Sequence, residues 1–371
     1  MSPNYSKRVA ALAAFVFTMV LLFASNAMAQ HFTRTDLTAN NANVANVPNI
    51  DPNLVNAWGM SRSSGSPWWI SDNGTGLSTL YDGTGLAQSL VVTIPLPNGQ
   101  TGTSAPTGTV FNAFNGSFEV VPGQRAVFLF ATENGTIAGW NFNVDLNNAF
   151  VKVDNSASGA VYKGLAIGMT AGGPRLYATN FISGQVEIYD SKFHRVNVNR
   201  TAAFTDSRLP ANYAPFGIQN VGGNIVVSFA KRLPGEKDEI HGAGFGFVDV
   251  FDLNGNLLLR LQHNQTMNAP WGIAQAPGDF GAFSHRILIG NFGDGTIHAY
   301  NAMSGKLEGT IEDANGAPIW IDGLWGLSFG GGNTNSGLAN ELFYTAGPNE
   351  EADGLLGKLS PVGSDQRGNS E

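Results

Sequence analysis

The sequence NAPWGIA at 268–274, followed after a loop by RILIGNFGDGTIHAYN at 286–301, decides how the chain is organised. The apolar run 287–289 is short and rich in β-branched residues, and GDG at 293–295 suits a tight turn that needs positive φ. Residues 296–300 then alternate apolar and polar side chains, as a strand with one buried face does. The sequence therefore predicts an antiparallel β-unit, which cannot bury both its faces alone.

The same unit recurs along the whole chain. Its marker glycines stand at positions 59, 108, 164, 217, 272 and 326, in steps of 49, 56, 53, 55 and 54. An even period near 50 residues that is made of strands is typical of propeller blades rather than of helical arrays. The 47 glycines in 371 residues suit many tight turns. We therefore predict an all-β fold, a six-bladed β-propeller with four-stranded antiparallel blades.

The segment HFTRTDLT at 31–38 alternates like a strand but precedes the first repeat. A propeller closes when one terminus supplies a strand to the blade formed by the other, which removes an exposed sheet edge. The sixth repeat stops after its third strand, near Leu359. We therefore expect residues 32–37 to form the outer strand of the sixth blade.

The first 29 residues differ in kind from the repeats. Lys7 and Arg8 precede an apolar run at 9–23, and Ala27-Met28-Ala29 offers a cleavage site. This pattern predicts a removed secretory signal peptide at 1–29, a propeller at 30–360 and a flexible tail at 361–371, in a secreted or periplasmic protein. The alternative is a retained membrane anchor, for which the run is short. No membrane span is expected after cleavage.

Composition excludes several classes of function. Without residues 1–29 the chain has 18 basic and 28 acidic residues, a net charge of −10. Proteins that bind nucleic acid backbones carry a basic stripe, so no nucleic acid partner is expected. The chain has no cysteine, which excludes a thiol nucleophile, a cysteine-ligated zinc and a disulfide framework. We expect a monomer that is stabilised by core burial and ring closure.

Two sets of loops share one face of such a propeller: those that enter each inner strand and those that join the second strand to the third. The longest loops of the second set span 231–241 and 347–354, and the latter is acidic. Because loops on a rigid scaffold carry function, we place the functional site on this face. Loops of the opposite face, such as 330–334, offer little chemistry.

Ligand-binding candidates on the loop-rich face are aromatic and basic. They are Trp58, Trp271, Trp325, Lys231 and His241. The tryptophans precede repeat glycines, so they are either stacking platforms for a ligand or packing wedges between blades, because buried area dominates aromatic energetics.

Metal-ligating candidates are oxygen-bearing residues from separate blades. They are Asp72, Asn180, Asn291, Asp322 and Glu133. Ca²⁺ takes carboxylate and amide oxygens, which makes calcium the expected cofactor if one is present. The alternative is structural, since Asp and Asn at strand ends commonly bond to local backbone. The acidic loop 347–354 is likewise either solvated or part of a ligand site.

Four segments carry a resemblance to a known family. LVNAWGM at 54–60, APWGIA at 269–274, DGLWGLSFG at 322–330 and ELFYTAGPNEEADGLLGKL at 341–359 resemble a family of secreted bacterial six-bladed propellers, some with PEP-CTERM tails. This chain ends without such an apolar tail. The repeat is more distantly similar to NHL and gluconolactonase-type (SMP-30-like) propellers. That similarity implies the fold and, as one activity, a calcium-assisted lactonase or esterase.

Two functions therefore remain open. The first is a scaffold that binds a small molecule, glycan, peptide or envelope protein on its loop-rich face. The second is a calcium-dependent hydrolase whose metal polarises an ester or lactone carbonyl. We prefer the first because a fold alone does not give chemistry and no proton-transfer pair is identifiable by spacing. Standard catalytic motifs such as the Walker loop and H-E-x-x-H are absent.

Overall fold

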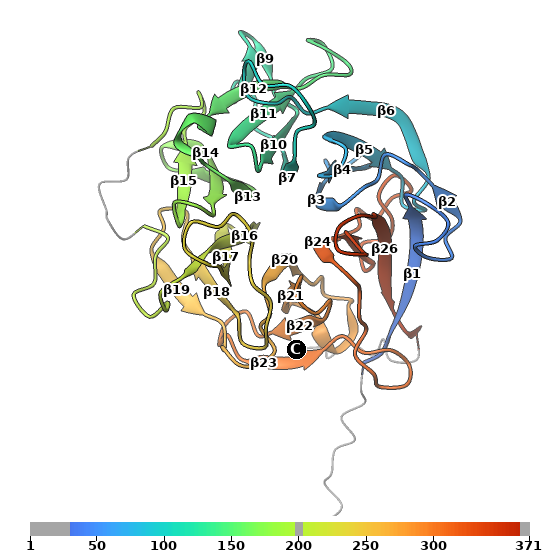
Figure 1. The fold of residues 1–371 in the computed structure, drawn as a ribbon. Coiled ribbons are helices and arrows are strands. Elements are labelled where there is room, and N and C mark those ends of the chain that lie inside the picture. The colour runs from blue at the N-terminus through green and yellow to red at the C-terminus, as the bar shows by residue number, and fades with distance from the viewer. Residues whose placement is uncertain (1–29, 197–202, 364–371) are drawn as a thin grey trace, which may run out of the picture.

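The computed structural model describes residues 30–196 and 203–363, so the expected signal peptide and residues 364–371 of the expected tail lie outside the described residues. Six β-sheets stand as blades around a central axis (Figure 1). The predicted all-β six-bladed propeller is confirmed. In the described part the helices are two short 3-10 turns, η1 (Ser156–Ser158) and η2 (Gly281–Phe283), and neither is long and apolar enough to cross a membrane.

Each blade is built of antiparallel strands that run outward in chain order, except that the N-terminal β1 (Phe32–Ala39) forms the outer strand of blade six and pairs in parallel with the short β2 (Asn49–Ile50). Blade one contains β3 (Ala57–Ser61), β4 (Trp68–Asp72), β5 (Leu77–Tyr81) and β6 (Ala87–Thr93). Blade two contains β7 (Pro106–Phe111), β10 (Phe128–Thr132), β11 (Thr136–Trp140) and β12 (Phe150–Asp154), with the small hairpin β8 (Glu119–Val121) and β9 (Gln124–Arg125). Blade three contains β13 (Tyr162–Thr170), β14 (Gly173–Asn180) and β15 (Gln185–Tyr189).

The second half of the ring repeats the pattern. Blade four contains β16 (Tyr213–Val221), β17 (Asn224–Lys231), β18 (Gly246–Phe251) and β19 (Leu257–Arg260). Blade five contains β20 (Pro270–Gln275), β21 (Ile287–Asn291), β22 (Ile297–Tyr300) and β23 (Leu307–Thr310). Blade six contains β24 (Leu324–Phe329), β25 (Leu342–Ala346), β26 (Leu355–Pro361) and β1 (Phe32–Ala39), with β2 (Asn49–Ile50) beside β1.

Blade three has three strands within the described residues. Arg195 forms a bridge with Tyr189, and the Val196 N–H donates to the carbonyl of Ile188 at 2.8 Å. The chain thus starts to run beside β15 before it enters residues 197–202, which lie outside the described residues. The fourth position of this blade is occupied at least at its beginning.

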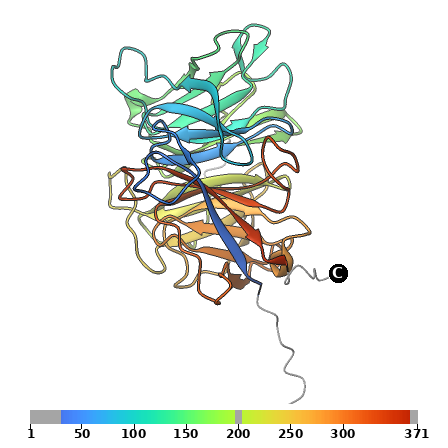
Figure 2. The same cartoon turned by 90° about the vertical axis from the view of Figure 1, so that its right-hand side faces the viewer.

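The N-terminal strand closes the ring as predicted. β1 pairs antiparallel with β26, with Phe32 opposite Pro361 and Ala39 opposite Leu355, and it extends two residues beyond the expected 32–37. Figure 2 shows β1 crossing the side of the molecule next to the C-terminal strand. β26 continues to Pro361, and the Val362 N–H donates to His31 O at 2.9 Å. The last strand of blade six thus ends at Pro361, next to the expected boundary at residue 360.

The repeat glycines allow the inner strands to approach one another. A Cβ at Gly272 would lie 2.6 Å from the carbonyl oxygen of Trp325, and one at Gly326 would lie 2.7 Å from that of Trp58. Each marker glycine thus faces the inner strand of the next blade, and the last faces the first. Any larger residue would push two blades apart, which explains why glycine recurs at this position.

A β-bulge accompanies every one of these glycines. The pairing of each inner strand with its second strand shifts register at this point in all six blades. Bulges re-aim side chains, and here the residue before each glycine turns toward the axis. We call these six residues the axial ring: Trp58, Thr107, Lys163, Phe216, Trp271 and Trp325.

Candidate functional site

Four aromatic members of the axial ring close the centre of the propeller. Trp58 stacks on Trp325 with ring centroids 3.6 Å apart, and Trp271 meets both edge-on at 6.0 and 5.7 Å. Phe216 contacts Trp325 at 5.8 Å. None of the three tryptophans is more than 9% exposed, so a ligand could stack on them only after the groups above them moved. We call Trp58, Phe216, Trp271 and Trp325 the aromatic plug.

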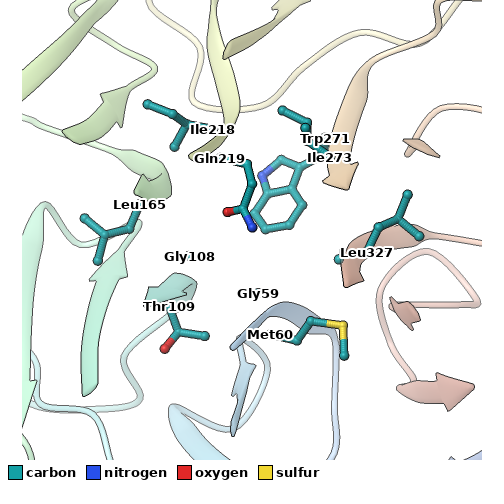
Figure 3. Close-up of a pocket in the computed structure, with 11 residues that line it drawn as sticks. Gly59, Met60, Gly108, Thr109, Leu165, Ile218, Gln219, Trp271, Ile273 and Leu327 are labelled. Atoms are coloured by element: carbon teal, nitrogen blue, oxygen red, sulfur yellow. The ribbon is translucent and has the colours of Figure 1, made fainter. Parts of the chain in front are cut away.

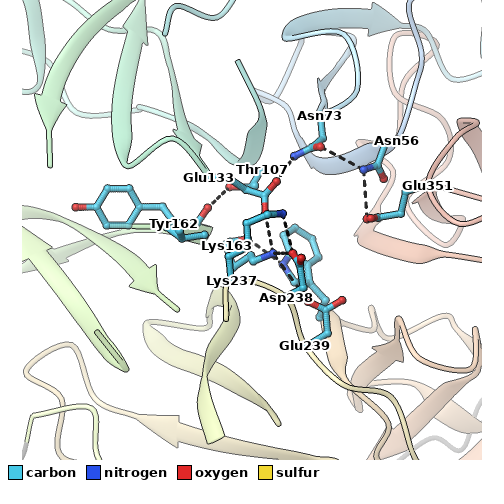
Figure 4. Close-up of polar contacts among 12 residues, drawn as sticks. Asn56, Asn73, Thr107, Glu133, Tyr162, Lys163, Lys237, Asp238, Glu239 and Glu351 are labelled. Carbon is cyan, nitrogen blue, oxygen red and sulfur yellow. Dashed lines mark hydrogen bonds and ion pairs between the residues drawn. The ribbon is translucent and has the colours of Figure 1, made fainter. Parts of the chain in front are cut away.

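Lys163 occupies the same ring position but carries a charge. Its side chain is only 2% exposed, and its Nζ lies 2.7 Å from Glu133, 3.6 Å from Asp238 and 3.9 Å from Glu239 (Figure 4). Its ammonium group also lies 5.1 Å from the Trp58 ring centroid. Burial alone would lower the pKa of Lys163, but the carboxylates, Glu133 first, raise it above its ordinary value. Lys163 is therefore charged at neutral pH.

Glu133 is the closest partner of this lysine. Burial would raise the pKa of Glu133, but the attraction and hydrogen bond from Lys163 outweigh it and hold the pKa below its ordinary value. The other oxygen of Glu133 accepts a hydrogen bond from Asn73 at 3.2 Å. A buried ion pair, formed between blades two and three, thus lies directly over the aromatic plug.

The long loop between β17 and β18 brings further charges over the axis. The Ile240 N–H donates to Lys231 O at 2.8 Å, and the Gly242 N–H donates to Asn268 Oδ1 at 2.7 Å. His241 Nε2 lies 3.6 Å from Glu239, and the hydrogen bond with Glu239 raises the pKa of His241. The loop therefore folds across the mouth of the channel instead of extending into solvent.

The blade-six loop completes this rim. Glu351 Oε1 accepts a hydrogen bond from Asn56 at 3.2 Å, and burial together with the nearby Glu239 raises the pKa of Glu351. Asn349, Glu350 and Glu351 all have positive φ, at 56°, 53° and 66°. Left-handed backbone in three successive non-glycine residues is strained, and such strain gathers at functional sites. We call Glu133, Lys163, Asp238, Glu239, His241 and Glu351 the charged mouth.

The other predicted ligand-binding residue, Lys231, lies beside this group. Its Nζ lies 3.8 Å from the centroid of the Phe245 ring, a cation–π contact that holds it against the base of the long loop. Of the five residues predicted to bind a ligand, His241 belongs to the charged mouth and the tryptophans form its floor.

The predicted metal ligands are engaged within their own blades. Asp72 Oδ2 accepts hydrogen bonds from the N–H and hydroxyl of Thr79, and burial raises the pKa of Asp72 well above its ordinary value. Asn180 Nδ2 donates to Glu187 at 3.0 Å, and its Oδ1 accepts from the Ser183 N–H at 3.2 Å. Both contacts match the local hydrogen bonding that Asp and Asn make at strand ends.

Asn291 and Asp322 are held in the same manner. Asn291 Oδ1 accepts from the Asn268 N–H at 3.1 Å, and Asp322 Oδ2 accepts from the Asn349 N–H at 2.9 Å. Among residues 30–196 and 203–363, no three His, Asp or Glu side chains are grouped so that they could hold a metal ion. Of the five predicted ligands, Glu133 alone belongs to the charged mouth, and calcium binding itself stays a prediction.

Sequence reasoning missed Lys163, Asp238, Glu239 and Glu351 as site residues. A signal for the first was present, because Lys163 is the one charged residue among the six that precede the repeat glycines. The two acidic residues of the long loop had no such signal. Their position depends on how the loop folds back, which its sequence does not specify.

The opposite end of the axis is hollow. A cavity of about 460 Å³ lies there, and a smaller one of about 30 Å³ sits under the aromatic plug (Figure 3). Met60, Thr109 and Gln219 line both cavities. We call the larger one the polar funnel; its polar side chains are Ser61, Arg62, Ser63, Ser64, Thr109, Gln219, Asn220 and Ser328. This cavity lies on the face where the sequence led us to expect little chemistry.

Comparisons with known proteins agree with the fold. No family model matches the chain. Two structures of similar fold are a glucose dehydrogenase (TM-score 0.53, 12% identity, 88% of this chain and 99% of that one) and a catalytically inactive virginiamycin B lyase from Staphylococcus aureus with quinupristin (TM-score 0.52, 13% identity, 90% and 100%). At these identities the likeness shows the propeller fold alone.

Sequence relatives come from a virus. The "Uncharacterized protein R648" of Acanthamoeba polyphaga mimivirus is 32% identical over 335 residues, 87% of this chain and 78% of that protein. The "Uncharacterized protein L690" of the same virus is 30% identical over 317 residues, 83% and 81% respectively. These relatives carry no information on secretion or on a bacterial origin. The identity and coverage place this chain, a six-bladed propeller, in one family with these mimivirus proteins.

Proposed function

We propose that this protein is a ligand-binding propeller whose recognition site is the charged mouth. The observation that carries the proposal is Lys163, a lysine with a 2% exposed side chain that is surrounded by carboxylates from two other blades. The ligand is a glycan, a peptide or an envelope partner outside the cytoplasm. The secreted or periplasmic location is part of the same proposal and rests on the sequence of residues 1–29.

Packing does not account for a charge at this position. A buried ion pair often contributes no more stability than apolar residues of similar volume. Four other blades place Trp or Phe at the same ring position, so the fold has an apolar solution available. Groups with perturbed pKa values cluster at functional sites, and here the pKa values of Glu133, Lys163, His241 and Glu351 are all shifted. These points favour a functional role for the charge.

The accessible groups of the mouth suit a polar ligand. Two side chains of the mouth reach solvent, Asp238 at 64% exposed and His241 at 47% exposed, and so does that of the neighbouring Lys237, at 59%. They offer donors, acceptors and both signs of charge. The aromatic plug beneath them is covered, which disfavours a flat apolar ligand. Hydrogen-bonding ligands such as peptides and glycans match these groups best.

The test is a binding screen of the full chain against glycan and peptide arrays, followed by substitution. The double variant Asp238→Ala/His241→Ala removes exposed groups of the mouth and is expected to lose the captured ligand. The matched control is Asp279→Ala/His194→Ala, which removes the same residue types from exposed loops away from the mouth. A ligand that the mouth variant still captures as well as the control would refute the assignment.

A further inference from the structure

The polar funnel has the dimensions of a second binding site. Its volume of about 460 Å³ falls in the range of small-molecule sites, roughly 300–1,000 Å³. Its wall combines strand ends from blades one, two, three, four and six with the loop that follows β3. No Asp, Glu or Lys lines it, and its single charged side chain is that of Arg62.

Arg62 leaves part of its guanidinium free. Its Nε and Nη2 donate to Phe329 O at 3.2 and 3.1 Å, and Nη2 also donates to Gly330 O at 2.9 Å. A guanidinium has five N–H groups, and Nη1 makes only a long contact of 3.4 Å with Ser63 O. Within the described part of the chain Arg62 has no ion pair. One edge of the positively charged Arg62 guanidinium therefore faces the funnel without a counter-ion.

The partial burial of Arg62 also favours an anion beside it. It lowers the pKa of Arg62, because the charged form is partly removed from water with no carboxylate nearby to compensate. The Arg62 guanidinium also lies 5.4 Å from the centroid of the Trp68 ring, which fixes its direction.

Gln219 supplies a second free polar group. Its side chain extends into the channel beside Trp271 (Figure 3), and both residues line the small cavity under the aromatic plug. Its amide has no hydrogen-bond partner among the residues that the structure describes, whereas the neighbouring Asn220 donates to Ile167 O at 2.8 Å. An amide that is free on the wall of both cavities can donate to a ligand or accept from it.

We propose that the polar funnel binds a small oxyanion, a carboxylate or phosphate group, through Arg62, with the Gln219 amide donating to the same molecule. This site is separate from the charged mouth and independent of the function proposed there. An excess of acidic groups makes that mouth a poor site for anions, so the two ends of the axis select ligands of different charge. Succinate and inorganic phosphate are suitable probes, and they distinguish the two oxyanion types.

The experiment is isothermal titration of the full chain with each probe separately. Gln219→Glu places a negative charge in the funnel and is expected to weaken binding about tenfold or more, because a hydrogen bond to a charged group is lost and a repulsion is added. Gln88→Glu makes the same change of charge on an exposed outer strand and is expected to bind like the wild type. Binding of one probe alone would identify its oxyanion type as the ligand group.

A second variant tests the cation directly. Arg62→Gln is expected to abolish binding of both probes. Because Arg62 also ties blade one to the end of β24, its melting curve must be compared with that of the wild type; if the variant is unfolded, the result with Gln219→Glu decides. The proposal is overturned if the wild type binds neither probe, or if Gln219→Glu binds the better probe as tightly as Gln88→Glu does.

Discussion

The charged mouth and the polar funnel lie at opposite ends of the same ring of inner strands, yet they differ in almost every property. At one end the bulges turn large side chains such as Trp325 toward the axis, and the long loop covers them. At the other end the strands carry Ser61, Thr109 and Ser328, which leave a cavity. The repeat therefore fixes where the side chains are placed, and the residue at each end of a strand decides whether that end is filled or hollow.

The largest effect on stability is expected from Trp325→Ala, which removes part of the aromatic plug that separates the two ends. Trp325 is fully buried and stacks on Trp58 and on Phe292, with centroids 3.6 and 3.9 Å apart. Its loss is expected to reduce the free energy of unfolding by about 3–5 kcal/mol in urea denaturation. Acrylamide should also quench the remaining tryptophans more strongly. Trp320→Ala is the control, since Trp320 is 57% exposed; equal destabilisation by both would contradict the role of the plug.

A slightly smaller effect is expected from Lys163→Met, which removes the cation from the charged mouth. Glu133 and Glu239 would then be left without their buried partner, at a cost of about 3 kcal/mol in the free energy of unfolding. The double variant Lys163→Met/Glu133→Gln removes both charges of the closest pair and is expected to recover part of that loss. A double-mutant cycle in urea measures this coupling. Strict additivity of the two substitutions would show that the pair does not interact.

The sequence predicted the frame of the molecule better than its sites. The spacing of the repeat glycines follows from close contact between inner strands, and the alternation in residues 32–37 follows from their place in a sheet, so both are readable. The direction in which side chains point at the ends of the strands could not be read from the sequence. Asp72 binds Thr79 and Asn180 binds Glu187, in each case seven residues further along the hairpin. These partners turn the side chains back into their own blades.

The long loop limits prediction for a different reason. The contacts of Asp238 and Glu239 with Lys163 join residues more than 70 positions apart and depend on the path of an irregular segment. No periodicity encodes that path. What the sequence did offer was the contrast within the axial ring, where one lysine stands among aromatic residues and a threonine.

A modest effect on stability, limited to a defined pH range, is expected from His241 in the charged mouth. The pKa of His241 is raised above its ordinary value of 6.5, first by its hydrogen bond with Glu239 and then by the charges of Glu351 and Asp294. Its stabilising contribution is therefore present below about pH 6.5 and is lost as the pH rises through the raised pKa.

The measurement compares melting temperatures of the wild type and His241→Gln from mildly acidic to mildly alkaline pH. The wild type is expected to be the more stable protein on the acidic side, and the difference should shrink as the pH rises. The same substitution at the exposed His194 is the control. A difference that stays constant across the range would show that His241 does not titrate against Glu239 in the folded state.

The smallest effect on the melting temperature is expected from the addition of calcium. Three of the four side-chain oxygens of Asp72, Asn180 and Asn291 already accept hydrogen bonds, from Thr79, Ser183 and Asn268 respectively. The fourth, Asp72 Oδ1, is buried without a partner. Melting curves in calcium and in chelator are therefore expected to coincide, since a ligand raises the melting temperature only if it binds the native state. Asn180→Ala and Asn291→Ala will each lower stability by removing hydrogen bonds, so the informative quantity is the shift between calcium and chelator within each variant. A calcium-dependent rise in the wild type that both substitutions reduce would contradict this expectation and restore the calcium-dependent hydrolase, because only a shared ion links residues that otherwise bond within separate blades.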